Sequence, residues 1–275
     1  MTQEEINLMV ELYKKGLSAA AIGKYVPYTP HTVLKYVQAS GVPIRSRAGF
    51  KKPFNESYFH EIDTEKKSYL LGFLMADGNV QTRINSQPAI RLEIGRKDRI
   101  IVETLKSELA TDREVHNSRK DCCRLVVHSQ KLFDDLAMYG VVPSKTGHEI
   151  FPRNKIPENL IHHFLRGFID GDGWLTRTKH GHWKPCLNLG MCGNVHMLSD
   201  IRDYFCETLD CYHLKISSAR GYDGFGNLIY SSRKDVKAIC EYLYDDATIY
   251  LQRKKEKYDS FFNADAERVS IKKSA

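Results

Sequence analysis

The first forty residues place apolar side chains at the spacing of short helices. Apolar positions three or four residues apart predict a helix over residues 4–15. Ser18 is a suitable N-cap for a second helix over residues 19–25. Thr29 is a suitable N-cap for a third, which Pro30 begins because proline fits the first helical turn. The pattern predicts a small all-helical segment at the start of the chain.

Three short helices with a tight turn before the last are typical of a helix-turn-helix. Residues 1–43 resemble the helix-turn-helix of resolvases and many phage proteins, although a small helical cap that binds nothing is the alternative. The resemblance implies that the third helix enters the major groove of DNA. Arg45 and Arg47 begin a basic linker over residues 44–55 that would contact phosphates or the minor groove, unless it is only a solvated surface. The third-helix residues expected to face DNA are His31, Thr32, Lys35 and Tyr36.

The rest of the chain contains one pattern twice. An apolar run with an early glycine and a final Asp-Gly occupies residues 70–78 (LLGFLMADG) and residues 165–173 (LRGFIDGDG). Each run predicts a helix, and the same element order follows it: two strands, a helix, two strands and a helix. The fold class is therefore α+β, with pseudo-symmetric αββαββα repeats over residues 56–152 and 153–262. Residues 263–275 are expected to form a polar, basic and mobile tail.

Alternation and helical spacing place the individual elements. In the first repeat the strands are predicted at 79–83, 89–95, 114–118 and 123–128, and the later helices at 98–109 and 130–139. In the second repeat the strands are predicted at 174–178, 185–191, 212–217 and 228–231, and the later helices at 195–209 and 233–244.

The glycines of the two motifs have two expected roles. Gly72 and Gly167 leave room for another backbone to approach each motif helix closely. Gly78 and Gly173 are expected to end the helices in the left-handed conformation that glycine adopts readily.

Asp77 and Asp172 lie in the last turn of the predicted motif helices. The helix dipole disfavours a negative charge there, so their presence in both copies indicates a functional role. Two such helices packed side by side would bring the carboxylates together, where they repel unless a divalent cation lies between them. The pattern therefore favours a Mg²⁺ site.

With these motifs in place, the chain resembles the LAGLIDADG homing endonucleases in their two-repeat, single-chain form, over about residues 56–262. The resemblance implies that the motif helices form a pseudo-twofold interface and that saddle-shaped sheets cover the major groove of a long DNA target. It implies cleavage of both strands with short 3′ overhangs by a monomer using two or more divalent ions. Asp77 and Asp172 would bind these ions, with the carbonyl groups of Gly78 and Gly173 nearby.

The second motif has charged residues at two positions where the first is apolar. Asp170 stands where the first motif has Met75, a position that varies in the family. Arg166 is unusual for the motif and is expected on the outer face of its helix. Phe73 and Phe168 replace an aliphatic residue and are expected in the interface or the core.

The resemblance also implies a lysine after the last helix of each repeat, and the matching residues are Lys145 and Lys254. They would polarise metal-bound water or stabilise the phosphate in the transition state, and surface lysines are the alternative. Arg253 and Lys255 compete with Lys254 for this position. Arg96, at the end of a strand, would also reach a phosphate.

The strand residues expected to point outward and contact bases are Gln81, Arg83, Arg91, Glu93, Thr176, Arg177, Lys184 and Asn188, and a solvated sheet face is the alternative.

Charge and composition narrow the function classes. The chain has 41 Lys and Arg against 34 Asp and Glu, a net charge of +7, and the excess lies at the two ends. A basic end favours a polyanionic partner. A polar, acidic start and short apolar runs exclude a typical signal peptide and a transmembrane helix, so we expect a cytoplasmic, nucleoid-associated protein without a membrane partner.

The leading hypothesis is a site-specific, metal-dependent DNA endonuclease with double-stranded DNA as its partner. A non-cleaving transcriptional regulator on the same fold is an alternative, although such proteins usually lose the motif acids. An intron RNA maturase is a third possibility, since it would use the same fold and basic surface with intron RNA as its partner.

Overall fold

The chain forms two compact units, Met1–Pro53 and Phe54–Ala275, each with its own hydrophobic core. The computed structural model describes residues 1–44, 54–119, 121–178, 185–218 and 224–273, with the backbone alone for residues 264–273. None of the helices in this described part has the length and apolar character that a membrane crossing needs.

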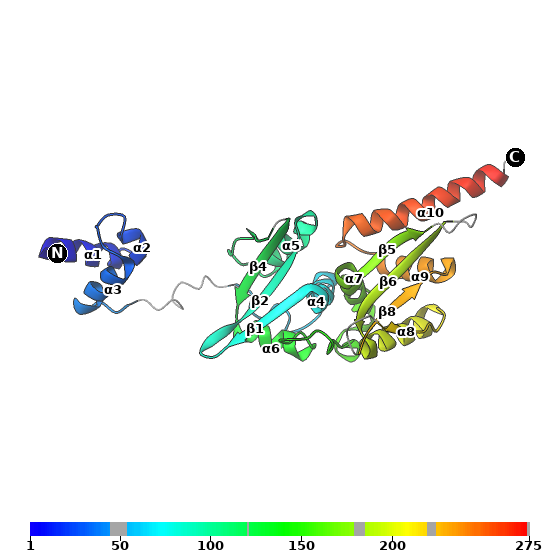
Figure 1. Ribbon diagram of the computed structural model, residues 1–275, viewed down its shortest axis with the longest axis horizontal. Coiled ribbons are helices and arrows are strands. Elements are labelled where there is room, and N and C mark those ends of the chain that lie inside the picture. The colour runs from blue at the N-terminus through cyan, green and yellow to red at the C-terminus, as the bar shows by residue number, and fades with distance from the viewer. Residues whose placement is uncertain (45–53, 120, 179–184, 219–223, 274–275) are drawn as a thin grey trace. The chain divides into compact units, whose positions relative to one another are not determined.

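The first unit contains three short helices close to the predicted positions (Figure 1). Thr2, Ser18 and Thr29 each accept a hydrogen bond from a backbone N–H in the first turn of the helix they precede. The helices are α1 (Gln3–Lys14), α2 (Ala19–Ile22) and α3 (Pro30–Ala39). Apolar residues from all three helices form the small core, among them Met9, Ile22, Val33 and Val37.

The second unit contains the two predicted repeats in the predicted element order. The first repeat comprises α4 (Glu65–Asp77), β1 (Gly78–Arg83), β2 (Ser86–Gly95), α5 (Arg99–Glu108), β3 (His116–Asn117), β4 (Cys122–His128) and α6 (Gln130–Met138). The second comprises α7 (Ile161–Asp172), β5 (Gly173–Thr178), β6 (Cys186–Asn194), α8 (Val195–Leu209), β7 (Ser217–Ser218), β8 (Phe225–Tyr230) and α9 (Arg233–Tyr244). The predicted α+β fold of two αββαββα repeats is therefore confirmed.

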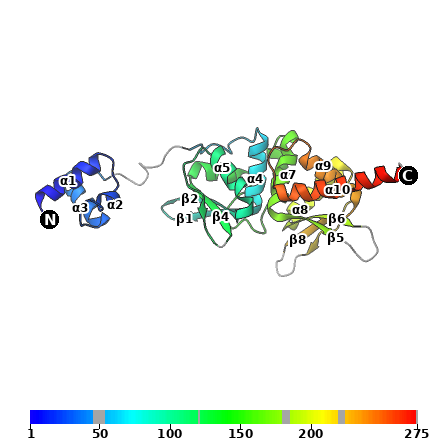
Figure 2. The same ribbon diagram turned by 90° about the horizontal axis from the view of Figure 1, so that it is seen from above.

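Each repeat has an antiparallel sheet with the same strand order. The described strands pair as β1-β2-β4-β3 in the first sheet and as β5-β6-β8-β7 in the second. Strand β2 shows why one face of the sheet is buried: Ile90, Leu92 and Ile94 are buried, whereas the intervening Arg91 and Glu93 are not. Helices cover the buried face of each sheet, and the other face stays open (Figure 2).

Two predicted strands are much shorter than expected. Among the described residues, the third strand of each sheet pairs over two residues, His116–Asn117 in β3 and Ser217–Ser218 in β7. Both lie at a sheet edge, where only one neighbour supplies hydrogen bonds, and their residues are exposed.

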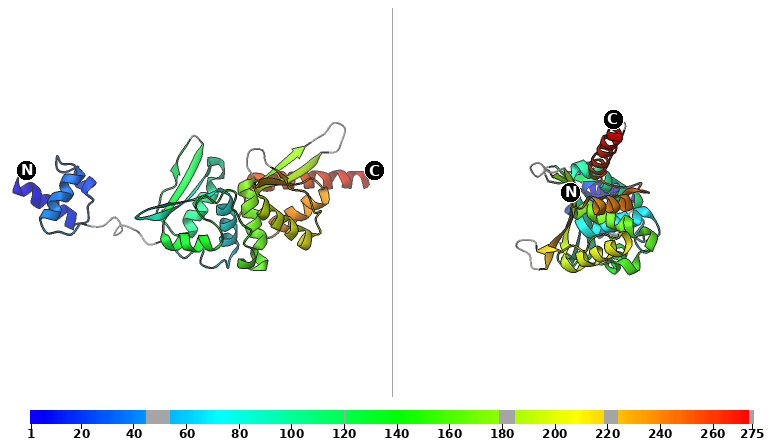
Figure 3. Two further views of the ribbon diagram at one scale, coloured as in Figure 1. Left: turned by 60° about the horizontal axis from the view of Figure 1, so that its bottom comes forward. Right: turned by 90° about the vertical axis from the view of Figure 1, so that its right-hand side faces the viewer.

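A last helix, α10 (Gln252–Lys273), follows the second repeat. Its first half packs on the second repeat, with Phe261 buried and Tyr258 and Phe262 against the core. Residues 263–273, expected as a tail, continue this helix in the backbone (Figure 3).

Candidate active site

The motif helices α4 and α7 lie side by side between the two repeats (Figures 1 and 2). A Cβ atom on Gly72 would lie 2.0 Å from the carbonyl oxygen of Phe164, and a Cβ on Gly167 would lie 2.0 Å from that of Tyr69. Either contact is far shorter than packed atoms allow. The predicted close backbone approach at these glycines is therefore confirmed, and it occurs between the two motif helices themselves.

Gly78 and Gly173 do not adopt the expected left-handed conformation. Their φ angles are −70° and −102°, both in the extended region, and each helix passes directly into the first strand of its sheet. Glycine is needed for a different reason: a Cβ on Gly78 would lie 2.3 Å from the carbonyl oxygen of Leu74, and one on Gly173 would lie 2.5 Å from that of Ile169. The prediction was wrong because no turn separates helix from strand.

Asp77 and Asp172 are the last residues of α4 and α7. Asp77 comes close to the second motif, since its Oδ2 lies 3.3 Å from where a Cβ of Gly171 would stand. The surrounding protein displaces water around Asp172, and this together with the charge of Asp77 raises the Asp172 pKa to about 7. Desolvation also raises the pKa of Asp77, although its side chain remains accessible to solvent.

Two accessible carboxylates, one of which hinders the ionisation of the other, are a suitable donor set for a divalent cation. Carboxylate oxygens are the ligands that Mg²⁺ prefers, and a cation would remove the repulsion between them. The carbonyl groups of Gly78 and Gly173 follow each aspartate directly, but that of Gly173 already accepts a hydrogen bond from Lys254. The residues present therefore fit the predicted metal site.

Lys145 lies at this site, in the loop after α6. It is buried, and its Nζ donates to the carbonyl oxygen of Ala76 at 2.7 Å, next to Asp77. Burial lowers the pKa of Lys145, while the charges of Asp172, Glu149 and Asp77 oppose that decrease. This is the only hydrogen bond of its ammonium group to the described residues, so two N–H donors remain for other groups.

Lys254 lies at the corresponding position of the second repeat, in the first turn of α10. Its buried Nζ donates to the carbonyl oxygens of Ile169, Asp170 and Gly173 at 2.6, 2.7 and 2.6 Å, which uses all three of its N–H donors. Burial lowers the pKa of Lys254 to about 8, and the neighbouring Asp170 and Asp77 favour its charged form. The lysine supplies the positive charge that the C-terminus of α7 favours.

The two neighbours that compete with Lys254 in the sequence point elsewhere. Arg253 donates to both carboxylate oxygens of Asp98, and Lys255 forms an ion pair with Asp259 on its own helix. Lys254 is thus the residue of this basic run that reaches the motif aspartates.

The open face of the first sheet carries most of its predicted base-contacting residues. Gln81, Arg91 and Glu93 lie on it, with Arg91 donating to Gln81 across the strands at 3.4 Å. Arg124 of β4 pairs with Glu93 on the same face and was missed, although the alternation of β4 would have found it. Arg83 lies at the exposed end of β1, beyond a register shift, and Arg96 is exposed in the short 3₁₀ helix (Arg96–Asp98) after β2.

The open face of the second sheet has a different character. Thr176 and Asn188 are paired neighbours on it, and Trp174 lies across Gly190, where a Cβ would be 2.3 Å from the indole ring. Arg177 does not lie on this face: its side chain is on the side of Leu175, with its guanidinium group over the ring of Phe261. Adjacent strand residues point to opposite faces, so Thr176 and Arg177 could not both have faced DNA. Lys184 lies outside the described residues.

In the first unit, the residues predicted to face DNA differ in exposure. His31 and Lys35 are exposed on α3, whereas Thr32 is half-buried and its backbone N–H donates to the capping Thr29. Tyr36 packs partly against the core of the unit. Arg45 and Arg47 lie outside the described residues.

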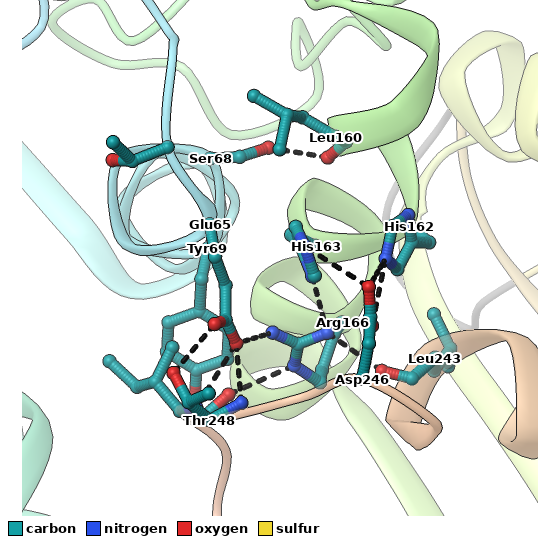
Figure 4. Close-up of polar contacts among 12 residues, drawn as sticks. Glu65, Ser68, Tyr69, Leu160, His162, His163, Arg166, Leu243, Asp246 and Thr248 are labelled. Atoms are coloured by element: carbon teal, nitrogen blue, oxygen red, sulfur yellow. Dashed lines mark hydrogen bonds and ion pairs between the residues drawn. The ribbon is translucent and has the colours of Figure 1, made fainter.

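Arg166 is fully buried rather than on the outer face of its helix, contrary to expectation (Figure 4). Its guanidinium group forms an ion pair with Glu65 of α4 at 2.6 Å and donates to the carbonyl oxygens of Leu243 and Ile249. Glu65 also accepts hydrogen bonds from the backbone and hydroxyl groups of Thr248. The residue therefore joins the first motif helix to the segment that precedes α10.

Asp170 takes part in the same connection. Its buried Oδ2 accepts hydrogen bonds from the hydroxyl group of Tyr69 in α4 and from the backbone N–H of Leu251, both at 2.8 Å. Burial raises the pKa of Asp170, because little water remains to stabilise its charge. In the first motif the corresponding Met75 is buried among apolar residues. Met75 thus packs in the core, whereas Asp170 links α7 to α4 and to the segment before α10 by hydrogen bonds.

One other group of side chains in the described residues has metal-ligand character: His162, His163 and Asp246. His163 accepts a hydrogen bond from Arg166 through Nδ1, which leaves the hydrogen of the neutral ring on Nε2. Burial lowers the pKa of His163 to about 4, so the ring is neutral. Because Nε2 is the atom that faces Asp246, this tautomer disfavours a metal ion there.

No protein-family model matches the sequence, and no curated protein matches it. Solved structures do match its fold. The LAGLIDADG meganuclease I-AabMI bound to uncleaved DNA has a TM-score of 0.53 and 16% identity, over 74% of this chain and 91% of its own. The I-SmaMI LAGLIDADG homing endonuclease bound to cleaved DNA has a TM-score of 0.53 and 13% identity, over 72% and 88%.

A third structure, I-SmaMI bound to uncleaved DNA in the presence of calcium ions, has a TM-score of 0.51 and 13% identity, over 75% of this chain and 92% of its own. At these identities the similarity concerns the fold. Paired motif helices, two antiparallel sheets of one strand order and these structural matches lead to one conclusion. The chain has the fold of the LAGLIDADG homing endonucleases.

Proposed function

We propose that this protein is a site-specific homing endonuclease that makes double-strand breaks in a long DNA target, with Mg²⁺ as its cofactor. The observation that carries the proposal is the arrangement of Asp77 and Asp172, which end two helices in direct backbone contact, with Lys145 and Lys254 beside them. The solved structures with this fold include DNA complexes, one of them with calcium ions.

In this proposal the aspartates bind metal ions, and the lysines supply positive charge and hydrogen-bond donors. Asp77 and Asp172 would hold divalent ions, with the carbonyl groups of Gly78 and Gly173 as further oxygen donors. Such ions, when bound, stabilise the negative charge that develops on the phosphate and lower the pKa of water. Lys145 has free N–H donors for a phosphate oxygen or a water molecule, whereas Lys254 acts through its charge and by fixing the end of α7.

The open sheet faces and the first unit would select the target. Gln81, Arg91 and Arg124 on the first sheet offer donors suited to base edges in the major groove. His31 and Lys35 of α3 would contact DNA at a flanking position, as the predicted helix-turn-helix implies. Two linked DNA-binding units increase the apparent affinity through effective concentration. In this proposal the protein acts inside the cell as a monomer with internal pseudo-twofold symmetry.

Cleavage of a randomised duplex library tests the proposal. The protein is incubated with Mg²⁺, and the wild type is compared with Asp77→Asn and Asp172→Asn. We expect double-strand cuts at one long consensus that require the metal and are lost in both variants. The matched control is Asp134→Asn, which changes an exposed acid on α6 and should leave cleavage unaltered.

Two other results would contradict the endonuclease. Specific DNA binding without any cut, by the wild type and both variants alike, would identify a regulator. Neither cutting nor DNA binding, together with binding to intron RNA, would identify a maturase.

A further inference from the structure

The segment that carries each active-site lysine is anchored on the opposite repeat. Arg253, the neighbour of Lys254 in α10, reaches into the first repeat, where its Nε and Nη2 donate to the carboxylate of Asp98 at distances of 3.0 to 3.2 Å. Asp98 is mostly buried and directly precedes α5. The contact therefore joins the second repeat's lysine segment to the first repeat.

The loop that carries Lys145 makes the reverse connection. The carbonyl oxygen of Gly147 accepts a hydrogen bond from Nδ2 of Asn194, which is buried in the second repeat. The Oδ1 atom of Asn194 caps α8 by accepting from the backbone N–H groups of His196 and Met197. One side chain thus holds its own helix and the first repeat's lysine loop together.

Asp98 and Asn194 both lie between the second strand of a sheet and the helix that follows it, although strand register matches Asn194 with Gly95 and places Asp98 three residues further along. Asn194 caps α8 with its side chain, whereas Asp98 ends the short 3₁₀ helix before α5 and makes no side-chain cap hydrogen bond. Each repeat thus contacts the opposite lysine segment from the same connection, in one case by an ion pair and in the other by a neutral hydrogen bond. A surface contact of no consequence would have little reason to occur in the same connection of both repeats.

We propose that Asp98 and Asn194 are positioning residues, each of which holds the active-site lysine of the opposite repeat: Asp98 holds Lys254 through Arg253, and Asn194 holds Lys145 through Gly147. The catalytic part of this proposal rests on the proposed endonuclease function, whereas the positioning part concerns the protein alone. Each half of the active site is complete only when the other repeat is in place.

The two lysines should respond to different degrees. Lys145 is held by a single hydrogen bond, so its position depends strongly on the loop that Asn194 anchors. Lys254 keeps three hydrogen bonds to the end of α7 when Arg253 no longer binds Asp98. Replacement of Asn194 should therefore expose Lys145 more than replacement of Asp98 exposes Lys254.

Competitive acetylation of lysine side chains, read by peptide mass spectrometry on the full-length protein, tests the crossed pattern. Asn194→Ser keeps a capping oxygen but is too short to reach Gly147. We expect it to raise the labelling rate of Lys145 about tenfold, the size expected for one lost buried hydrogen bond, and to leave Lys254 unchanged. Asp98→Asn should raise the labelling rate of Lys254 by about threefold and leave Lys145 unchanged.

Two matched controls separate positioning from general loosening. Asp259→Asn removes the ion pair of Lys255, which lies within α10 and does not cross to the first repeat. Ser232→Asn changes the N-cap of α9, whose side chain hydrogen-bonds its own helix at Asp235 in the described part of the chain. Both should leave Lys145 and Lys254 protected. Labelling that rises at the lysine of the same repeat, at both lysines equally, or at neither would overturn the proposal.

Cleavage adds a second readout that a purely structural role would not produce. If each lysine serves one scissile phosphate, Asn194→Ser and Asp98→Asn should accumulate nicks on opposite strands of the target. Nicks on the same strand would contradict the crossed arrangement. If the wild type does not cut DNA, the endonuclease proposal fails, and the labelling experiment still decides whether the positioning is correct.

Discussion

Lys145 and Lys254 occupy equivalent positions but differ in how they are held. The ammonium group of Lys254 is saturated by three carbonyl oxygens at the end of α7, whereas that of Lys145 has one such partner at the end of α4. Helix C-termini leave carbonyl groups without an intrahelical partner, and a lysine satisfies both the hydrogen bonds and the dipole. Lys254 is therefore also a structural residue.

This difference predicts unequal effects of Lys145→Met and Lys254→Met on stability. Removing Lys254 leaves buried acceptors unpaired beside Asp170, so the free energy of unfolding should fall by about 3 kcal/mol or more. Removing Lys145 should cost about 1 kcal/mol, because only one hydrogen bond disappears. Urea unfolding measures both values, with the exposed Lys97→Met as a control expected within about 0.5 kcal/mol of wild type. Equal losses for the two variants would contradict the distinction.

At the scale of elements, the crossing of α4 and α7 determines where the aspartates lie. The helices approach so closely at Gly72 and Gly167 that each lacks space for even one methyl group. Helix packing through small residues lets backbones approach closely and fixes their relative position. Since Asp77 lies five residues after Gly72, a shift at the crossing would move the carboxylate as well.

Gly72→Ala should therefore impair both stability and cleavage. The added Cβ would lie 2.0 Å from the carbonyl oxygen of Phe164, so the helices must move apart. We expect the free energy of unfolding to fall by about 3 kcal/mol, at the upper end for overpacking. The matched control is Gly95→Ala, whose Cβ would meet nothing closer than the Lys97 side chain at 3.8 Å. Thermal unfolding compares the two, and a near-neutral Gly72→Ala would show that the crossing tolerates separation.

Repetition explains why the element order and the two aspartates could be predicted from the sequence. Each motif supports the interpretation of the other, and alternation and caps place most elements within a few residues. Local patterns could not predict the partners of Arg166, because Glu65 lies 101 residues away. The same holds for Asp98 and Asn194, whose contacts depend on how the repeats pack. The expectation that Arg177 contacts bases together with Thr176 was wrong. Strand alternation alone places the two side chains on opposite faces of the sheet.

At the scale of the whole molecule, the chain combines a unit of about fifty residues with the two-repeat unit. The first unit has a core of its own, and residues 1–53 hold eight Lys and Arg against three Glu. Binding to DNA releases counterions in proportion to the phosphates contacted. The first unit should thus contribute affinity that depends on salt concentration.

Deletion of residues 1–53 should weaken DNA binding and reduce its salt dependence. The slope of log K against log salt should become less steep by about 0.9 for each phosphate that the shortened protein no longer neutralises. The cleavage consensus under the two sheets should stay the same. Fluorescence anisotropy at several salt concentrations measures the slope, and Lys35→Ala in the full chain should reproduce part of the change. An unaltered slope would mean that the first unit does not contact DNA.

Buried Arg166 and Asp170 determine how the two repeats can be combined. Their partners Glu65 and Tyr69 come from the first repeat, and the equivalent places in the second repeat hold Leu160 and Phe164. A dimer of two second repeats would bury two arginines and two aspartates without those partners, at a cost that a marginally stable protein does not tolerate. The two repeats are therefore not interchangeable. Under the proposed function, such non-interchangeable halves would suit a DNA target whose two sides differ in sequence.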